Sequence, residues 1–362
     1  MNGATDLERL PSLDDAEGDW RALAPQTENV FASWEWGSIW WRHFGEGREP
    51  LVTRCSDENG NVVALLPLYL WRKRPIRVAR FIGHGPADQL GPLCSKDVRT
   101  TAAVALRRVL AAERCEVFVG DTLDRSERWA QLLEAKVYGR GSSPVLRLEW
   151  ETWDDFLATR SANFRSQLRR RERALRKLGA RPRLCDDREA LDRDLDTFFA
   201  LHHRRWQSGG SNVVRLTGFH REFAACAFDR GWLRLWFLEI DGEAVAAWYG
   251  LRYGTTESYY QAGRDPAWDR LAVGFVLLAH SVREALADGM DEYRFGRGGQ
   301  HYKTRFGPED EGFETIVLTR GAAGSAAMAG VGAVRRVRRR LRRMQAPAPR
   351  RPRSHADEHA GA

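Results

Sequence analysis

The chain has 362 residues, of which 43% are hydrophobic, and it contains 14 tryptophans and 16 phenylalanines. This is enough apolar material for two cores and excludes a wholly disordered protein. The net charge of +8 arises at one end, because residues 320–362 hold 11 arginines and two acids. The remaining residues carry a net charge of −1. The overall basicity therefore does not imply a nucleic-acid-binding body.

The cysteines and the first residues indicate a compartment. Five cysteines are scattered singly, without CxxC or metal-ligand spacing, so we expect free thiols in a reducing environment and no metal site. The first 20 residues are acidic and lack an apolar run, which argues against a signal peptide. No stretch approaches the ~20 apolar residues of a membrane span. We predict a cytoplasmic protein.

The first 144 residues predict a flexible start (1–20) and an N-terminal unit (21–144). Aromatic residues at three- and four-residue steps predict a helix over 31–44. Two β-rich runs flank Asn59-Gly60, which predicts a hairpin whose two turn residues both take positive φ. A helix over 97–113, a strand over 115–119 and a helix near 125–136 follow.

The second unit is predicted over 145–320. It begins with a strand (145–150) and helical stretches at about 152–178, 186–207 and 217–230. An antiparallel meander follows, with Asp241-Gly242 as its first turn. A helix over 271–288, a short strand at 292–296 and a closing strand at 313–321 complete the unit. The shared order of strand, turn, strand, turn, strand favours two copies of one α/β fold.

The last segment, 321–362, changes composition abruptly. Apolar residues from Val331 to Met344 recur at helical spacing with arginine between them, so we expect a helix followed by a disordered end. Two interpretations stay open for this tail. One is a solubilising tail, and the other is weak contact with an anionic membrane surface, peripheral at the inner membrane face.

The strongest local pattern is the end of the meander followed by a helix. Free N–H groups and the helix dipole at such a start attract anions, and Gly274 lets a phosphate approach the backbone. An ordinary strand-to-helix turn is the alternative. The candidate phosphate-binding residues are Leu271, Ala272, Val273, Gly274 and Phe275.

Two further clusters carry polar chemistry. Lys303 and Arg305 are two apart and would point to the same side of an extended segment, where they would stabilise an oxyanion or phosphate. A solvated basic loop is the alternative. His202 lies one turn before Trp206 at a helix end marked by Gly209-Gly210. It is either a general base or a structural histidine.

Residues 160–183 hold ten basic residues against one acid, Glu172. This pattern is typical of a solvated helix face or of a site for an anionic acceptor, for which Asn163 and Arg165 are the candidates. RNA binding is an alternative function of a different class. No base-reading motif supports it.

Taken in order, these motifs resemble the GNAT-superfamily acetyltransferases of the cellulose-biosynthesis (CelD/BcsL) type, which are relatives of the Fem aminoacyltransferases. The resemblance is strongest over about 150–310. The residues that carry it are Asn163-Phe164-Arg165, Leu201-His202 with Arg205-Trp206, Leu233, Asp241-Gly242, Tyr259-Tyr260, Gly263, Asp265-Pro266, Gly274, Phe295, Arg297-Gly298 and Tyr302-Lys303-x-Arg305.

The resemblance implies tandem GNAT-like units in a mixed α/β fold, the first unit degenerate. It implies an acyltransferase that takes acetyl-CoA or another acyl-CoA as co-substrate and needs no metal. The acceptor would be an amine, or a hydroxyl, of a small molecule, a sugar or a polysaccharide precursor. A Fem-like enzyme that uses aminoacyl-tRNA, and a non-catalytic protein that binds nucleic acid or membranes, are the alternatives.

The same resemblance implies roles for individual residues. By this resemblance Lys303 would polarise the acyl carbonyl. Acyl transfer also requires a proton for the leaving thiolate, which Tyr260 or Tyr302 would supply. The base is open among His202, Glu257 and Asp291. Relatives usually carry an acid where this chain has Gln300. Acyl-CoA would contact Tyr259 and Gln261 besides Leu271–Phe275, and the acceptor would contact Asn163, Arg165, Trp206, Arg297 and Arg305.

Overall fold

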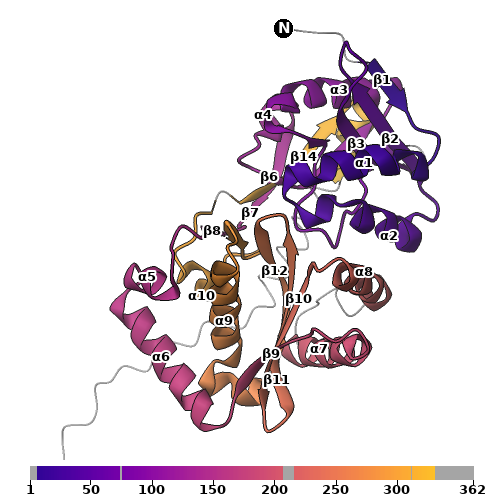
Figure 1. Ribbon diagram of the computed structural model, residues 1–362. Coiled ribbons are helices and arrows are strands. Elements are labelled where there is room, and N and C mark those ends of the chain that lie inside the picture. The colour runs from indigo at the N-terminus through magenta and orange to yellow at the C-terminus, as the bar shows by residue number, and fades with distance from the viewer. Residues whose placement is uncertain (1–5, 74–75, 207–215, 311, 331–362) are drawn as a thin grey trace, which may run out of the picture. The chain divides into compact units, whose positions relative to one another are not determined.

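The computed structural model describes residues 6–73, 76–206, 216–310 and 312–330 (Figure 1). It contains an eight-stranded and a six-stranded sheet, both mixed but mostly antiparallel, with helices packed around them. The predicted mixed α/β fold is therefore confirmed. No helix in the described part of the chain is long and apolar enough to cross a membrane. The arginine-rich tail from residue 331 and the predicted stop at Gly209-Gly210 lie outside the described residues.

The first sheet has the strand order β1-β2-β3-β4-β6-β14-β7, with β5 beside β3. Its strands are β1 (Asp6–Arg9), β2 (Glu49–Ser56), β3 (Val62–Lys73), β4 (Ile76–Phe81), β5 (Leu93–Cys94), β6 (Val117–Asp124), β7 (Lys136–Gly141) and β14 (Phe313–Thr319). The helices in this part of the chain are α1 (Glu17–Leu23), α2 (Trp34–Phe44), α3 (Arg99–Ala112) and α4 (Trp129–Leu132), with short 3₁₀ helices η1 (Asp14–Ala16), η2 (Ala24–Thr27), η3 (Val30–Ala32) and η4 (Lys96–Val98).

The second sheet has the order β8-β13-β12-β11-β10-β9. Its strands are β8 (Val145–Arg147), β9 (Arg181–Leu184), β10 (Leu233–Ile240), β11 (Glu243–Tyr253), β12 (Thr256–Arg264) and β13 (Glu292–Arg294). The helices here are α5 (Trp153–Ala158), α6 (Ala162–Lys177), α7 (Leu191–Arg205), α8 (Thr217–Asp229), η6 (Pro266–Leu271), α9 (Val273–Ala287) and α10 (His301–Thr304).

The predicted turns form as their residue types require. Asp241 and Gly242 both have positive φ, and Ile240 pairs with Glu243, so this is a two-residue hairpin. The hairpin at Asn59-Gly60 also forms, but only Gly60 has positive φ. Asp57 accounts for the difference, because its carboxylate accepts the N–H groups of Asn59 and Asn61 and stabilises a longer loop.

Two elements differ from the sequence-based expectation. The strand at 313–319 lies in the first sheet, between β6 and β7, and does not close the second unit. The helix expected near 125–136 is reduced to the four residues of α4, and β7 follows it. Long-range pairing decides both cases, because β7 and β14 each find their partner more than 150 residues away. The spacing of apolar residues within either segment carries no information on that partner.

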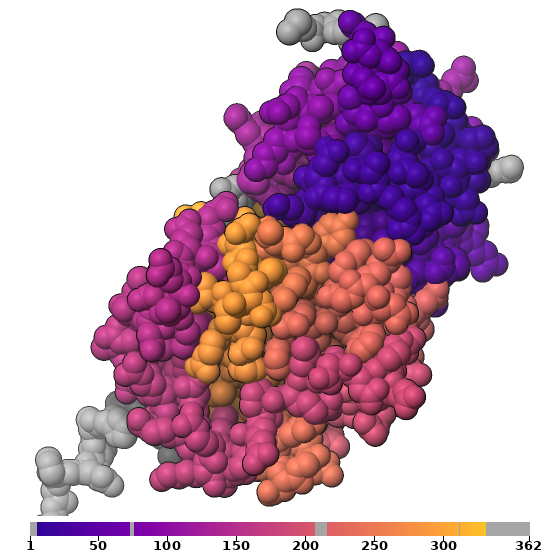
Figure 2. All heavy atoms as spheres, in the orientation of Figure 1, coloured from indigo at the N-terminus to yellow at the C-terminus, as the bar shows by residue number. Residues whose placement is uncertain are grey.

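The second sheet is covered on both faces. In β11, Tyr249 and Leu251 join the core shared with α7, α8 and the first sheet, whereas Ala246 and Trp248 join the core under α5, α6 and α9. This alternation follows from the two-residue period of a strand. In Figure 1, α9 lies between the sheet and α6, and the magenta atoms of the α5–α6 segment reach the surface in Figure 2.

Tight packing of α7 on β12 depends on Gly263. A β-carbon at this position would overlap the backbone nitrogen of His202 and lie 2.6 Å from the carbonyl carbon of Leu201. We expect Gly263→Ala to lower the free energy of unfolding by about 1–3 kcal/mol, because backbone atoms have little room to move. Urea denaturation measures this loss. Gly139→Ala is the control, since nothing lies within 4 Å of its β-carbon position, and an equal loss in both variants would contradict the packing argument.

Candidate active site

The second sheet opens between its parallel strands β12 and β13. β12 and β13 pair only from Thr256–Ser258 to Glu292–Arg294. Beyond that point β12 continues to Arg264, whereas the chain after β13 hydrogen-bonds to residues 142–144, through Phe295 N to Pro144 O and Gly298 N to Ser142 O. No described strand pairs with this side of β12 after Ser258. This edge of β12 is therefore not covered by a described strand, and an extended ligand could lie along it.

A β-bulge lies at the start of this opening. Tyr249 pairs with Gln261, and the next residue, Gly250, pairs with Tyr259, so Tyr260 is an extra residue in β12. A bulge leaves one residue outside the regular ladder and redirects its groups. The hydroxyl of Tyr260 is buried and donates a hydrogen bond to the carbonyl oxygen of Pro86 at 3.0 Å.

The helix after β12 begins as predicted. Ala272 has a φ of 52°, a left-handed conformation that is strained for alanine, and α9 begins at Val273. No side chain caps this end of the helix. Its first N–H groups and its dipole therefore favour an anion. A β-carbon at Gly274 would meet only the Cδ atom of Arg264 at 3.6 Å, so the backbone here can be approached closely.

Arginines gather around this helix start. The guanidinium of Arg305 lies 4.7 Å from the ring centre of Phe275, and that of Arg171 lies 5.7 Å from the same ring. Burial, and then the neighbouring Arg171, lower the pKa of Arg305. Neither guanidinium forms an ion pair with a described carboxylate, so two like charges face one short segment. This arrangement favours a phosphate-bearing ligand. Arg171 was not among the predicted site residues.

Lys303 lies in a second cluster. The expectation that Lys303 and Arg305 share one side of an extended segment is wrong, because His301–Thr304 forms the helix α10 and the two side chains have different neighbours. Its side chain is buried, its Nζ donates to the carbonyl oxygen of Arg297 at 2.9 Å, and the same atom lies 5.1 Å from the ring centre of Tyr259. Burial lowers the pKa of Lys303 to about 8. The structure thus brings together the predicted residues Tyr259, Tyr302 and Lys303 and adds Arg205, which interacts with both tyrosines.

A loop from the first part of the chain reaches this cluster. The Nε of Arg297 lies 2.6 Å from Asp88 Oδ1, and its terminal nitrogen donates to Gly85 O at 3.3 Å. Burial lowers the pKa of Lys303, and the negative charge of Asp88 acts in the opposite direction. Burial raises the pKa of Tyr260, and the charge of Asp88 raises it further. Asp88 is far away in sequence, and no motif signalled it. Only the tertiary fold identifies this carboxylate.

The three candidate bases lie in different surroundings. His202 is fully buried, its Nδ1 donates to Ala262 O at 3.0 Å, and burial lowers its pKa to about 4. Glu257 is buried in an ion pair with Arg252 at 2.6 Å. Asp291 is exposed, immediately before β13. The structure does not gather the three around one point, and their roles stay predictions.

The predicted acceptor residues are also dispersed. One nitrogen of Arg165 donates to three carbonyl oxygens at the end of α5, including that of Arg160 at 2.6 Å. Asn163 accepts from Gln167 at 2.8 Å on the first turns of α6, and Trp206 is 39% exposed at the end of α7. Their contact with an acceptor stays a prediction. Among the described residues, no group of three His, Cys, Asp or Glu is arranged to hold a metal ion.

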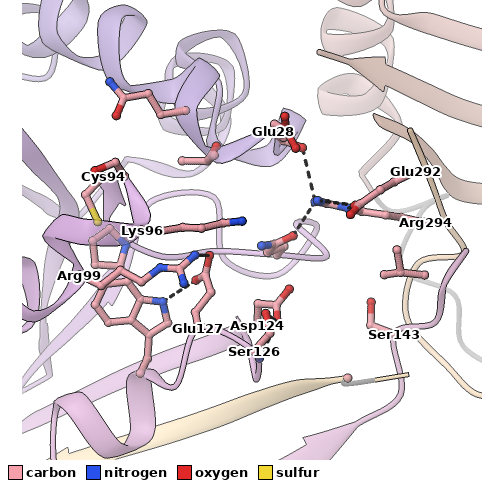
Figure 3. A pocket seen from close by; sticks show the side chains of 18 of the residues that line it. Glu28, Cys94, Lys96, Arg99, Asp124, Ser126, Glu127, Ser143, Glu292 and Arg294 are labelled. Atoms are coloured by element: carbon pink, nitrogen blue, oxygen red, sulfur yellow. Dashed lines mark hydrogen bonds and ion pairs between the residues drawn. The ribbon is translucent and has the colours of Figure 1, made fainter. Parts of the chain in front are cut away.

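A polar pocket of about 520 Å³ (Figure 3) includes Gln89, the residue after Asp88, in its lining. The three arginines in its lining are already paired, since Arg99 contacts Glu127 at 2.9 Å and both Arg147 and Arg294 contact Glu292, at 2.9 and 3.0 Å. Lys96 extends into the pocket in Figure 3. Arg294 also donates a hydrogen bond to the side-chain oxygen of Gln89 at 3.1 Å. Such a lining suits a hydrophilic ligand.

A match to a protein family covers most of the segment that carries the candidate site. Residues 162–304 match the family described as acetyltransferase (GNAT) domain. This segment contains α6, the antiparallel strands β10, β11 and β12, the start of α9 and Lys303. A GNAT domain implies acyl-CoA as co-substrate, and the uncapped α9 start with its arginines fits the phosphates of that group. A comparison with curated protein sequences finds no significant match.

Solved structures show the same fold over most of the chain. FemX is similar with a TM-score of 0.61 and 10% identity, covering 87% of this chain and 97% of that one. The C-terminal domain of a putative lysylphosphatidylglycerol synthetase from Agrobacterium fabrum has a TM-score of 0.54 and 12% identity, covering 89% and 98%. A conserved protein of unknown function from Bacteroides thetaiotaomicron has a TM-score of 0.53 and 12% identity, covering 88% of this chain and 100% of that one. These structures share the fold over most of the chain, and the family match over residues 162–304 supports an acyltransferase.

Proposed function

We propose that the protein is an N-acyltransferase that transfers an acetyl or acyl group from acyl-CoA to an amine of a small molecule, a sugar or a polysaccharide precursor. One observation carries this proposal. The start of α9 is uncapped, lies next to Arg171 and Arg305, and is joined through η6 to the strand that bounds the opening in the second sheet. An acyl-CoA with its phosphates at α9 would extend its arm along β12.

The cluster around Lys303 supplies groups for acyl transfer. The reaction needs stabilisation of the negative charge that develops on the carbonyl oxygen and a proton for the leaving thiolate. The ammonium group of Lys303 uses one of its N–H groups in a hydrogen bond to Arg297 O. Its other N–H groups remain for the carbonyl oxygen of the acyl group. We favour Tyr302 over Tyr260 as the proton donor, because the Tyr260 hydroxyl already donates to Pro86 O.

We propose Asp88 as the carboxylate that replaces the acid missing at Gln300. It holds Arg297, whose carbonyl oxygen receives Lys303, and its negative charge favours the protonated form of Lys303. Asp88 would therefore be a positioning residue for Lys303. The neutral state of His202 at neutral pH is compatible with proton acceptance, but its ring is buried against β12.

The acceptor is proposed to be hydrophilic. The polar pocket beside the Asp88 loop supports an amine on a sugar or small polar molecule over an apolar acceptor. The resemblance to the cellulose-biosynthesis type favours a polysaccharide precursor. A second candidate donor is aminoacyl-tRNA, which the likeness of the fold to FemX favours.

Calorimetry with acetyl-CoA tests the proposal. We expect the wild type to bind acetyl-CoA and Arg171→Ala/Arg305→Ala to bind about a hundredfold more weakly, because two charge-assisted contacts to phosphate are lost. The control is Arg114→Ala/Arg193→Ala, which removes the same charge from exposed positions. If the wild type binds an aminoacyl-tRNA but no acetyl-CoA, the proposed donor is aminoacyl-tRNA and not acyl-CoA. If both double variants bind acetyl-CoA with equal affinity, Arg171 and Arg305 do not contact its phosphates.

A further inference from the structure

The outward face of α6 carries a continuous row of cations. Successive residues of a helix are about 100° apart, so five basic side chains fall within about 120° on one side. The apolar residues Phe164, Leu168 and Leu175 lie on the opposite side and are buried in the core under α9. All five cations are exposed, and we call them the α6 stripe: Arg169, Arg170, Arg173, Arg176 and Lys177.

The charge of the α6 stripe is not compensated within the described residues. None of the five forms an ion pair there, and the one acid of the helix, Glu172, is bound by Arg283 at 2.9 Å. Arg173 has like-charged neighbours three and four positions away, and such pairs weaken a helix. Arg181, at the start of β9, is also exposed and extends the positive surface. Elsewhere the chain typically pairs its arginines, as Arg183 does with Asp194 at 2.8 Å.

An exposed apolar residue lies at the end of the α6 stripe. Leu178 follows Lys177 directly and is 44% exposed. Cations next to an exposed apolar side chain match the boundary between the headgroups and the acyl chains of a bilayer. The aromatic residue of α6, Phe164, is buried, so this helix has no exposed ring on which a base could stack, the feature typical of single-stranded nucleic-acid surfaces.

We propose that the α6 stripe docks the protein on an anionic lipid bilayer, with Leu178 at the interface. This surface is separate from the arginine-rich tail. It is also distinct from the phosphate site at α9, because Arg171 points from the inner side of α6 to Phe275. Docking by phosphate contacts weakens as salt concentration rises, since exposed charges are screened.

Vesicle binding by the full chain tests this proposal. The stripe variant is Arg169→Gln/Arg173→Gln/Arg176→Gln. The matched control is Arg114→Gln/Lys136→Gln/Arg193→Gln, which removes three exposed cations that have no ion pair within the described residues. The probes are vesicles of equal parts phosphatidylglycerol and phosphatidylcholine, vesicles of phosphatidylcholine alone, and a transfer RNA. A thermal melt shows whether each variant is folded.

We expect the stripe variant to bind the anionic vesicles about a hundredfold more weakly than the control variant does, and neither to bind phosphatidylcholine alone. The thermal melt of the stripe variant should be unchanged or higher, because repulsion within α6 is relieved. Equal vesicle affinity of the two variants would overturn the proposal. A loss of affinity for transfer RNA without a loss for vesicles would assign the α6 stripe to nucleic acid and would also overturn it.

Discussion

Replacing Lys303 by methionine should lower kcat/KM by about 10²–10³-fold, the loss that follows removal of one group that stabilises the developing negative charge. Methionine retains an unbranched chain in the buried position, so the loss reports the missing ammonium group. Activity is measured as release of CoA thiol with the fastest acceptor from a panel of amino sugars and amino acids. Lys136→Met, at an exposed position, is the control and should retain wild-type activity.

The pH dependence of the rate separates this role from a structural one. Burial lowers the pKa of Lys303 to about 8, so the protonated fraction falls as the pH rises through that value. Wild-type kcat/KM should therefore decline above about pH 8. Lys303→Met has no such group, and its residual rate should lack the decline. A variant that is slow but retains the same high-pH limb would show that another group titrates, and Lys303 would then be structural.

The parts of the fold that depend on local chemistry were predictable from the sequence. Asp241-Gly242 forms its hairpin because both residues tolerate positive φ. The helix after β12 begins within two residues of its expected start, because η6 is fixed by Asp265, which accepts the N–H of Ala267. Lys303 was found through a family pattern, and its buried position next to Tyr259 and Tyr302 is compatible with the expected role.

The rest of the site depends on contacts between distant segments. Asp88 reaches Arg297 across more than 200 residues, and nothing in the residues around Asp88 distinguishes it from a solvated loop carboxylate. Arg171 was hidden among exposed arginines of one helix. Its one signal is helical position, because it follows Leu168 by three and precedes Leu175 by four and so shares the buried side. A helical projection of α6 would have separated it from the α6 stripe.

Placing a carboxylate at Gly274 should have opposite effects on ligand binding and on the fold. In Gly274→Asp, a negative charge would lie where we propose that the phosphates of acyl-CoA bind, so affinity for acetyl-CoA should fall by more than about a hundredfold. The fold should not suffer. The β-carbon has an ordinary 3.6 Å contact with Arg264 Cδ, and an acid near a helix N-terminus stabilises the helix by about 0.3–1 kcal/mol.

Calorimetry and thermal unfolding of Gly274→Asp and Gly274→Ala separate the two effects. Gly274→Ala adds the β-carbon without the charge and should weaken acetyl-CoA binding much less than Gly274→Asp does. If the phosphates bind elsewhere, both variants will bind acetyl-CoA as the wild type does. A loss of binding accompanied by a lower unfolding temperature would indicate damage to α9 instead. Weaker binding together with unchanged or higher stability is the result that a structural role for this glycine cannot produce, because the same charge that repels the ligand favours the helix.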